Sequence, residues 1–148
     1  QKVKLPDGLK IIAEYAFSGC VSLTDINFPA SSLESIEDAA FEGCISLEEV
    51  TLPSSLKMIN DRAFALCTSL IIINLPTSLA AINDEAFRGC SSLLAVYFPN
   101  SLQHIGGSAF SDCCSLISVE LPPTVQVHDN AFSCCRTLEL RQPQVDWN

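Results

Sequence analysis

Cysteine is the residue type in this chain with the most evident capacity for chemistry. Such thiols could form disulfides, bind zinc or serve as small apolar side chains in a core. Six of the eight cysteines occupy one position of a repeating unit, between two apolar positions, so one role should explain them all. We interpret them as a buried column of small side chains. The six are Cys20, Cys44, Cys67, Cys90, Cys113 and Cys135.

Two further thiols, Cys114 and Cys134, fall outside this column and leave other chemistry open. Disulfides between adjacent repeats are an alternative, because parallel strands about 4.8 Å apart lie within the Cα separation that a bridge permits. In-register neighbours hold their Cβ atoms too far apart for an easy bridge, so oxidation is expected first at Cys114 or Cys134. The adjacent pairs Cys113-Cys114 and Cys134-Cys135, with His128 nearby, lack the C-x₂-C spacing of zinc knuckles. We therefore predict no metal and no cofactor.

No other residues are arranged for catalysis. His104 and His128 stand alone, without a Ser or Cys nucleophile at a spacing that indicates a triad. Gly106-Gly107 is not followed by the lysine and further glycines of a phosphate-binding loop. We expect this protein not to be an enzyme.

The residues between the cysteines also repeat, and they predict the elements that position the column. Ala-Phe pairs recur at intervals of 24, 23, 23, 23 and 22 residues, and a leucine follows each column cysteine three residues later. A fixed period of this length indicates a solenoid in which each unit packs on the next. The pairs are Ala16-Phe17, Ala40-Phe41, Ala63-Phe64, Ala86-Phe87, Ala109-Phe110 and Ala131-Phe132.

Each unit is predicted to contain one short strand that ends at a proline. In the second unit the alternation puts Val50 inside and Glu49 and Thr51 outside. Strands of successive units should pair in parallel, because the apolar positions must stay in register. Leu56 and Ile59, three residues apart, predict a second extended edge or tight bend that also faces the core.

The Ala-Phe segment predicts one turn of helix or a 3₁₀ turn. An Asp three residues before Phe could accept hydrogen bonds from the start of the helix, and a Gly two residues after Phe could end it in a left-handed conformation. The acids are Asp38, Asp61, Asp84 and Asp129, and the glycines are Gly19, Gly43 and Gly89.

The net charge of the chain and its distribution restrict the classes of partner that the chain can bind. The formal net charge of −9 argues against nucleic acid as a partner, because proteins that bind it carry a stripe of basic residues on their surface. Acidic residues, but no Lys or Arg, occur between Lys10 and Lys57. A solvated acidic face explains this run, and a basic partner or a weak cation site are the alternatives. No apolar run is long enough for a membrane span, so membrane insertion by this segment is not predicted.

The recurring pattern Ala-Phe-x-x-Cys-x-Ser-Leu-x-x-(Ile/Val)-x-(Leu/Phe)-Pro-x-x-(x)-Leu-x-x-Ile resembles the BspA-type leucine-rich repeats, over about residues 3–140. The resemblance implies an α/β solenoid: a right-handed superhelix with a parallel concave sheet, short helical or 3₁₀ turns on the convex side, and about six repeats. It also implies binding, since members are commonly surface or secreted adhesion and recognition proteins. The compartment stays open, because free thiols suit a reducing interior equally well.

We interpret residues 1–148 as one solenoid and as a piece of a longer protein. Residues 1–6 match the end of a preceding repeat, residues 7–132 form the array, and residues 133–148 are a degenerate last repeat or a C-terminal cap.

Function is expected on the outward row of the strands, which is the least repetitive part of the unit. An exposed Ile72 beside Tyr97, with a rim of acids, is typical of an interaction patch. The first hypothesis is a non-enzymatic recognition module that binds a protein partner through the concave sheet. The alternative is a structural or assembly subunit held in a larger complex by its ends and convex turns. The predicted partner-binding residues are Asp25, Asn27, Glu49, Thr51, Ile72, Asn74, Ala95, Tyr97, Ser118 and Glu120.

Overall fold

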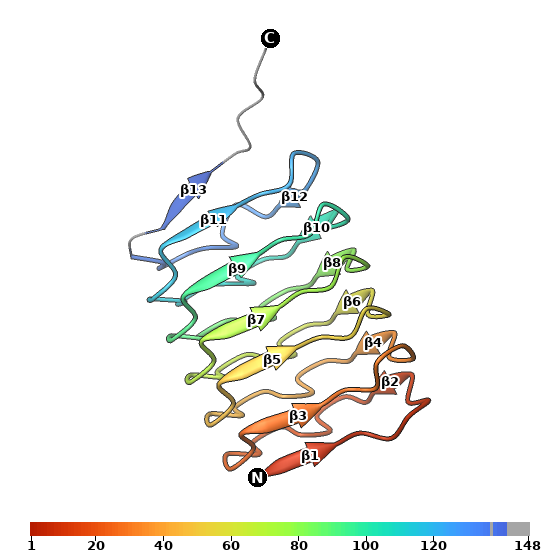
Figure 1. The fold of residues 1–148 in the computed structure, drawn as a ribbon. Helices are drawn as coiled ribbons and strands as arrows, with labels where there is room; N and C mark the ends of the chain where they lie inside the picture. Colours follow the sequence, from red (N-terminus) through yellow and green to blue (C-terminus); the bar gives the residue numbers. More distant parts are fainter. Residues whose placement is uncertain (137, 142–148) are drawn as a thin grey trace.

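The chain folds as a stack of parallel turns, a β-solenoid, in a computed structural model that describes residues 1–136 and 138–141 (Figure 1). Two rows of short strands run along the stack, and every strand pairing in the described residues is parallel. The first row is β1 (Lys2–Lys4), β3 (Asp25–Asn27), β5 (Glu49–Thr51), β7 (Ile72–Asn74), β9 (Ala95–Tyr97), β11 (Ser118–Glu120) and β13 (Glu139–Arg141). The second row is β2 (Ile11–Ile12), β4 (Ser35–Ile36), β6 (Met58–Ile59), β8 (Ala81–Ile82), β10 (His104–Ile105) and β12 (Gln126–Val127).

The first row is interrupted between β3 and β5. β1 pairs with β3, and β5 to β13 form a separate five-stranded sheet, whereas the second row is one continuous six-stranded sheet. The interruption coincides with the single 24-residue interval. Leu33 follows Phe28 by five residues, whereas Leu56 follows Leu52 by four. We attribute the lost pairing to this extra residue, which lies in the corner between β3 and β4.

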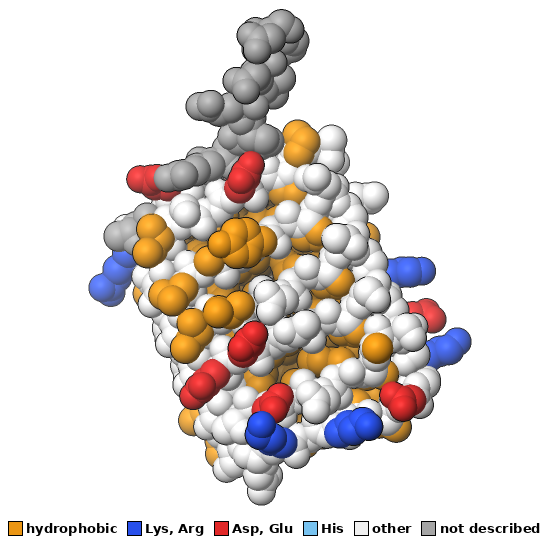
Figure 2. Space-filling model, in the orientation of Figure 1, with side chains coloured by type: hydrophobic (Ala, Val, Ile, Leu, Met, Phe, Trp, Pro, Cys, Tyr) orange, Lys and Arg blue, Asp and Glu red, His pale blue; other side chains and the backbone are white. Residues whose placement is uncertain are grey.

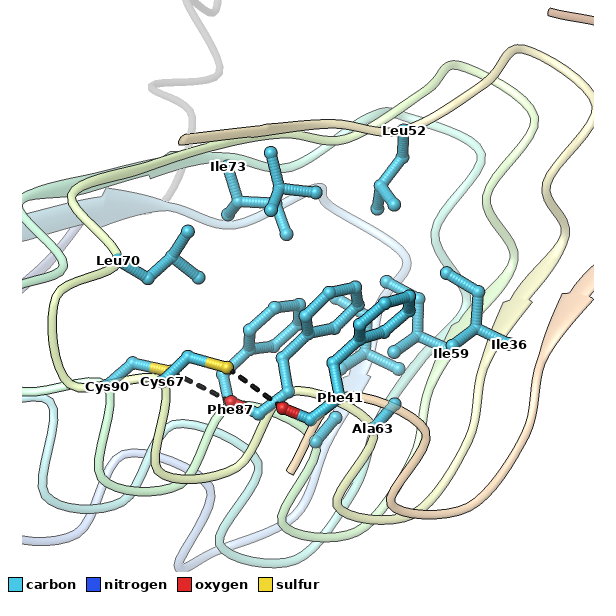
Figure 3. Close-up of a cluster of buried hydrophobic side chains, with 14 of the residues drawn as sticks. Ile36, Phe41, Leu52, Ile59, Ala63, Cys67, Leu70, Ile73, Phe87 and Cys90 are labelled. Atoms are coloured by element: carbon cyan, nitrogen blue, oxygen red, sulfur yellow. Dashed lines mark hydrogen bonds between the residues drawn. The ribbon is translucent and has the colours of Figure 1, made fainter. Parts of the chain in front are cut away.

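The core consists of columns that continue from turn to turn, as the sequence predicts. The central residues of β3, β5, β7, β9 and β11 face inward, and the Leu and Ile positions of the second row are fully buried from Leu33 to Ile105. The phenylalanines of the Ala-Phe pairs stack face to face from Phe17 to Phe132, with ring centroids 5.1–5.4 Å apart between neighbours. Figure 3 shows the part of this stack between Phe41 and Phe87. This stack fills the space between the strands and the opposite turns.

The predicted helical or 3₁₀ turns are wrong, and the fold class is therefore a β-solenoid and not α/β. The described residues contain no helix, because the N–H groups of each turn alternate between two kinds of acceptor. In the third turn, Ala63 and Ala65 donate within the turn, to carbonyls three residues earlier, whereas Arg62, Phe64 and Leu66 donate to carbonyls of the next turn. A helix would direct these N–H groups along its own axis, toward carbonyls of the same segment, and not alternately out of it. Left-handed backbone at Arg62 and Leu66, with φ of 57° and 59°, also interrupts helical geometry.

The acidic residues predicted as helix caps connect successive turns instead. The carboxylate of Asp61 accepts from the backbone N–H of Asp84 at 3.1 Å, and that of Asp84 accepts from Gly107 at 2.7 Å. In the last turn it is Asn130, one residue after the predicted Asp129, that connects two turns, and its side-chain oxygen accepts from the N–H of Ser108 in the preceding turn. The predicted left-handed glycines are confirmed, with φ of 69–73° at Gly19, Gly43 and Gly89.

Substituting Gly106 should test how tightly adjacent turns pack. A Cβ on Gly106 would lie within 2.7 Å of the backbone of Asn83 and Asp84 in the preceding turn. We expect Gly106→Ala to lower the free energy of unfolding by about 1–3 kcal/mol in urea denaturation, since the backbone must shift to relieve the overlap. Gly107→Ala is the matched control, because its Cβ would meet no atom closer than 3.4 Å. Equal losses for the two variants would contradict this packing.

Candidate functional site

The cysteine column is a structural feature with a hydrogen-bonding role that the sequence does not reveal. Each column thiol from Cys44 to Cys135 donates its S–H to the carbonyl of a phenylalanine in the preceding turn, at 3.2–3.3 Å (Figure 3). Cys67, for example, donates to Phe41, and Cys90 donates to Phe64. A small side chain that can both pack against apolar neighbours and donate a hydrogen bond suits this position.

Burial keeps these thiols protonated. It raises the pKa of Cys44 to about 11 and raises the pKa values of Cys67, Cys90 and Cys113 further. A protonated thiol is a hydrogen-bond donor and a poor nucleophile. The prediction of a buried column is confirmed for these four residues, whereas Cys20, in the first turn, is exposed and Cys135, in the last, is half-buried.

The two cysteines outside the column are exposed and unpaired with each other. Cys114 and Cys134 are free thiols, as are all the other cysteines of the described residues. In the same part of the chain, no group of three or more His, Cys, Asp or Glu side chains is arranged to hold a metal ion. His104 and His128 are both exposed.

The outward row predicted from the sequence is present, and we call it the strand face: the outward residues of β3, β5, β7, β9 and β11. Each of these strands has three residues, of which the central one is buried and the outer two are exposed or half-buried. In register, Glu49 lies beside Ile72, Ile72 beside Ala95, and Ala95 beside Ser118. The ten predicted residues therefore share one surface.

The strand face is divided into an apolar part and an acidic part (Figure 2). Tyr97 is 83% exposed and Ile72 is 45% exposed, although both side chains are largely hydrophobic. Beside Tyr97, a hollow of about 330 Å³ is lined by Phe98, Glu120 and Leu121. A hollow of this size can receive one side chain of a partner.

Three further residues extend the apolar part, and the sequence analysis missed them. Ile71, Leu94 and Ile117 lie just before β7, β9 and β11 and are 38%, 50% and 59% exposed. The signal for them was an apolar residue directly after the buried leucine, where the second unit has Glu48. With Ile72 and Tyr97, these three residues make up what we call the apolar patch.

The acidic part lies over β3 and β5, next to the interruption in the sheet. A cleft of about 630 Å³ opens there, lined by Asp25, Glu48 and Glu49 together with Asn27 and Thr51. The Asp25 carboxylate pairs with Lys2 at 3.0 Å across the surface. No ion pair involving Glu48 or Glu49 occurs within residues 1–136 and 138–141. Both side chains are exposed.

The turns on the opposite side of the stack carry both signs of charge. Arg62 pairs with Glu42 and, at 3.7 Å, with Glu85, and Arg88 pairs with Glu85 at 3.1 Å and with Asp112 at 3.9 Å. These pairs are largely exposed, so each contributes little to stability. Because the described residues contain no helix, no helix among them is a candidate for crossing a membrane.

Comparisons with known proteins agree with this geometry. The profile of the BspA type leucine rich repeat region matches residues 10–139 in six copies. The comparison with curated proteins gave no match. The crystal structure of a leucine rich repeat protein from T. pallidum is 40% identical in sequence with a TM-score of 0.89, over 96% of this chain and 70% of that one.

Two further solved structures are similar. A leucine-rich repeat protein from Bacteroides ovatus is 30% identical with a TM-score of 0.69, and the alignment covers 97% of this chain but 45% of that one. The pneumococcal vaccine antigen PcpA shares the fold at 16% identity and a TM-score of 0.58, over 100% of this chain and 58% of that one. Repeat number, column spacing and similarity in three dimensions agree: this chain belongs to the BspA-type leucine-rich repeat family.

Proposed function

We propose that this chain is a non-enzymatic recognition module that binds a protein partner through the strand face, the surface that the family resemblance predicts to be concave in a right-handed superhelix. The observation that carries the proposal is the apolar patch. Ile71, Ile72, Leu94, Tyr97 and Ile117 gather on three successive turns and are 38–83% exposed.

Adjoining hydrophobic side chains that are exposed to water lower the solubility of a protein, and a binding partner that covers them removes this cost. Large hydrophobic side chains that adjoin on a surface mark interaction sites, whereas scattered ones need no explanation. The patch contains a tyrosine next to a hollow and has acidic residues at its margin, an arrangement in which an aromatic anchor is surrounded by polar groups. The strands beneath it are fixed by parallel pairing from β5 to β13, so the surface is preorganised.

Replacing Tyr97 and Ile72 together with serine should weaken capture of native partners at least tenfold, because exposed anchors of this type carry much of the binding energy. Pull-down with the purified chain, quantified at several concentrations, measures the effect. The matched control is Ile11→Ser with Met58→Ser, which removes two similarly exposed apolar side chains from the second row of strands. If a folded Tyr97→Ser, Ile72→Ser variant captures partners as well as the parent chain does, the strand face is not the binding surface.

The alternative function, a structural or assembly subunit held by its ends and by the turns opposite the strand face, predicts a different pattern of contacts. Crosslinking of the captured complex, followed by mass spectrometry, distinguishes the two functions. Crosslinks on strand-face carboxylates such as Glu49 and Glu120, formed with a carboxyl-reactive reagent, support recognition through this surface. Crosslinks confined to the termini and to the turns around Arg62 and Arg88 support assembly.

A further inference from the structure

The strand face carries two features side by side whose combination specifies the chemistry of a partner. Glu49 of β5 is in register with Ile72 of β7, so the acidic part and the apolar patch meet at adjacent strands. Glu48 and Glu49 line the cleft at the sheet interruption, and both are exposed. The whole chain has a formal net charge of −9, which adds to the negative potential at this surface.

We infer that the strand face binds an extended protein segment that combines large apolar side chains with Lys or Arg. This inference rests on the proposed function and specifies the partner. The apolar side chains would lie on the patch over β7, β9 and β11, and the basic side chains would reach Glu48 and Glu49 at the cleft. Lys2, whose ammonium group lies 3.0 Å from the Asp25 carboxylate, shows how a cation is accommodated at this cleft.

The dimensions agree with a short segment. Neighbouring turns are spaced by about 4.8 Å, so the surface from β3 to β11 spans on the order of 20 Å along the stack. An extended chain advances about 3.3 Å per residue and crosses that distance in roughly six residues. Basic residues at one end and apolar residues at the other would then face the two parts of the strand face together.

A second copy of this chain is a poorer occupant. Two identical surfaces placed in an antiparallel pair would bring the carboxylates of one copy onto the apolar patch of the other, where they lose hydration without gaining a cation. The acidic balance of the chain also disfavours self-association. A partner of opposite charge has neither cost, and electrostatic complementarity would speed its association.

The test is selection from a random twelve-residue peptide library displayed on phage, against the intact chain. Selected peptides are expected to be enriched in Lys or Arg together with Leu, Ile, Phe or Trp. Synthetic copies should bind about threefold to tenfold more weakly to Glu48→Gln, Glu49→Gln and should weaken as salt rises from 50 to 300 mM. The matched control, Glu14→Gln with Glu34→Gln, makes the same change in net charge away from the strand face and should leave affinity unchanged.

The outcomes separate this inference from the proposed function. Peptides that depend on Tyr97 and Ile72 but have no basic bias, or that bind Glu48→Gln, Glu49→Gln as tightly as the parent, would overturn the basic partner and leave recognition intact. A library that yields no peptide sensitive to Tyr97→Ser, Ile72→Ser would count against both. A dimer of the chain alone that dissociates on Tyr97→Ser, seen by sedimentation equilibrium, would replace the basic segment with a second copy.

Discussion

Replacing Phe64 with alanine should lower the free energy of unfolding by about 3–5 kcal/mol, as truncation of a buried aromatic side chain does. Phe64 is fully buried, and its ring stacks between Phe41 at 5.1 Å and Phe87 at 5.4 Å. The change therefore removes apolar contact and two ring stacks, and leaves a cavity in the middle of the array where neighbouring turns hold it open. Urea denaturation followed by circular dichroism measures the loss.

Two controls define the comparison. Phe17 stacks on Phe41 alone among the rings of the described residues and is partly exposed, so Phe17→Ala should cost clearly less. Glu49→Ala changes an exposed side chain and should alter stability by no more than about 0.5 kcal/mol. Equal losses for Phe64→Ala and Glu49→Ala would mean that the inward and outward positions are misassigned.

Stability should fall steeply as the pH rises above about 9. Burial raises the pKa of Cys44 to about 11 and holds the pKa values of Cys67, Cys90 and Cys113 higher, above the ordinary thiol value of 9.0. As the pH rises, the unfolded chain therefore loses thiol protons before the folded chain does. The contribution of each buried thiol to stability is complete below the unfolded pKa and is lost as the pH rises from there to the folded pKa. Above the unfolded pKa, each buried thiol should cost on the order of 1 kcal/mol per pH unit until its folded pKa is reached.

Urea denaturation between pH 8 and 10.5, with a reductant present, measures this slope. Cys67→Ala should lower stability at pH 8 by about 1–2 kcal/mol, because it removes buried sulfur and a hydrogen bond to Phe41. It should also make the decline above pH 9 shallower, since one titrating thiol is gone. Cys114→Ser, at an exposed position, should leave the slope unchanged. A slope that Cys67→Ala does not alter would show that the buried thiols are not its cause.

The columns of the fold could be predicted from the sequence because packing holds them constant in each repeat. Val50, Leu56 and Phe64 and their counterparts face the core as their spacing indicates, and the strand face follows from the same alternation. Alternation has a period of two, so one correct inward residue fixes the direction of its neighbours. The predicted residues of the strand face therefore occupy the outer positions of their strands.

The turn conformation could not be predicted in the same way, because it depends on the neighbouring turn. An Asp before Ala-Phe and a Gly after it are typical of a helix start and end. In this chain the Asp61 carboxylate and the Phe64 N–H both find partners one turn further along the stack. Local sequence cannot distinguish a hydrogen bond within a segment from one to a parallel copy of it. Ile71 was missed for a related reason, since it lies one residue outside the predicted alternation.

The extra residue in the corner between Phe28 and Leu33 shows where this architecture accepts a change in length. The extra residue is accommodated in the corner, and the strand pairing between β3 and β5 is lost. The pairing of β2, β4 and β6 and the stacking of Phe17 on Phe41 are retained. Insertions engineered into the same corner of other repeats should be accommodated likewise, each one opening a new gap on the strand face. Variation in repeat length could thereby diversify what such arrays recognise without altering their interior.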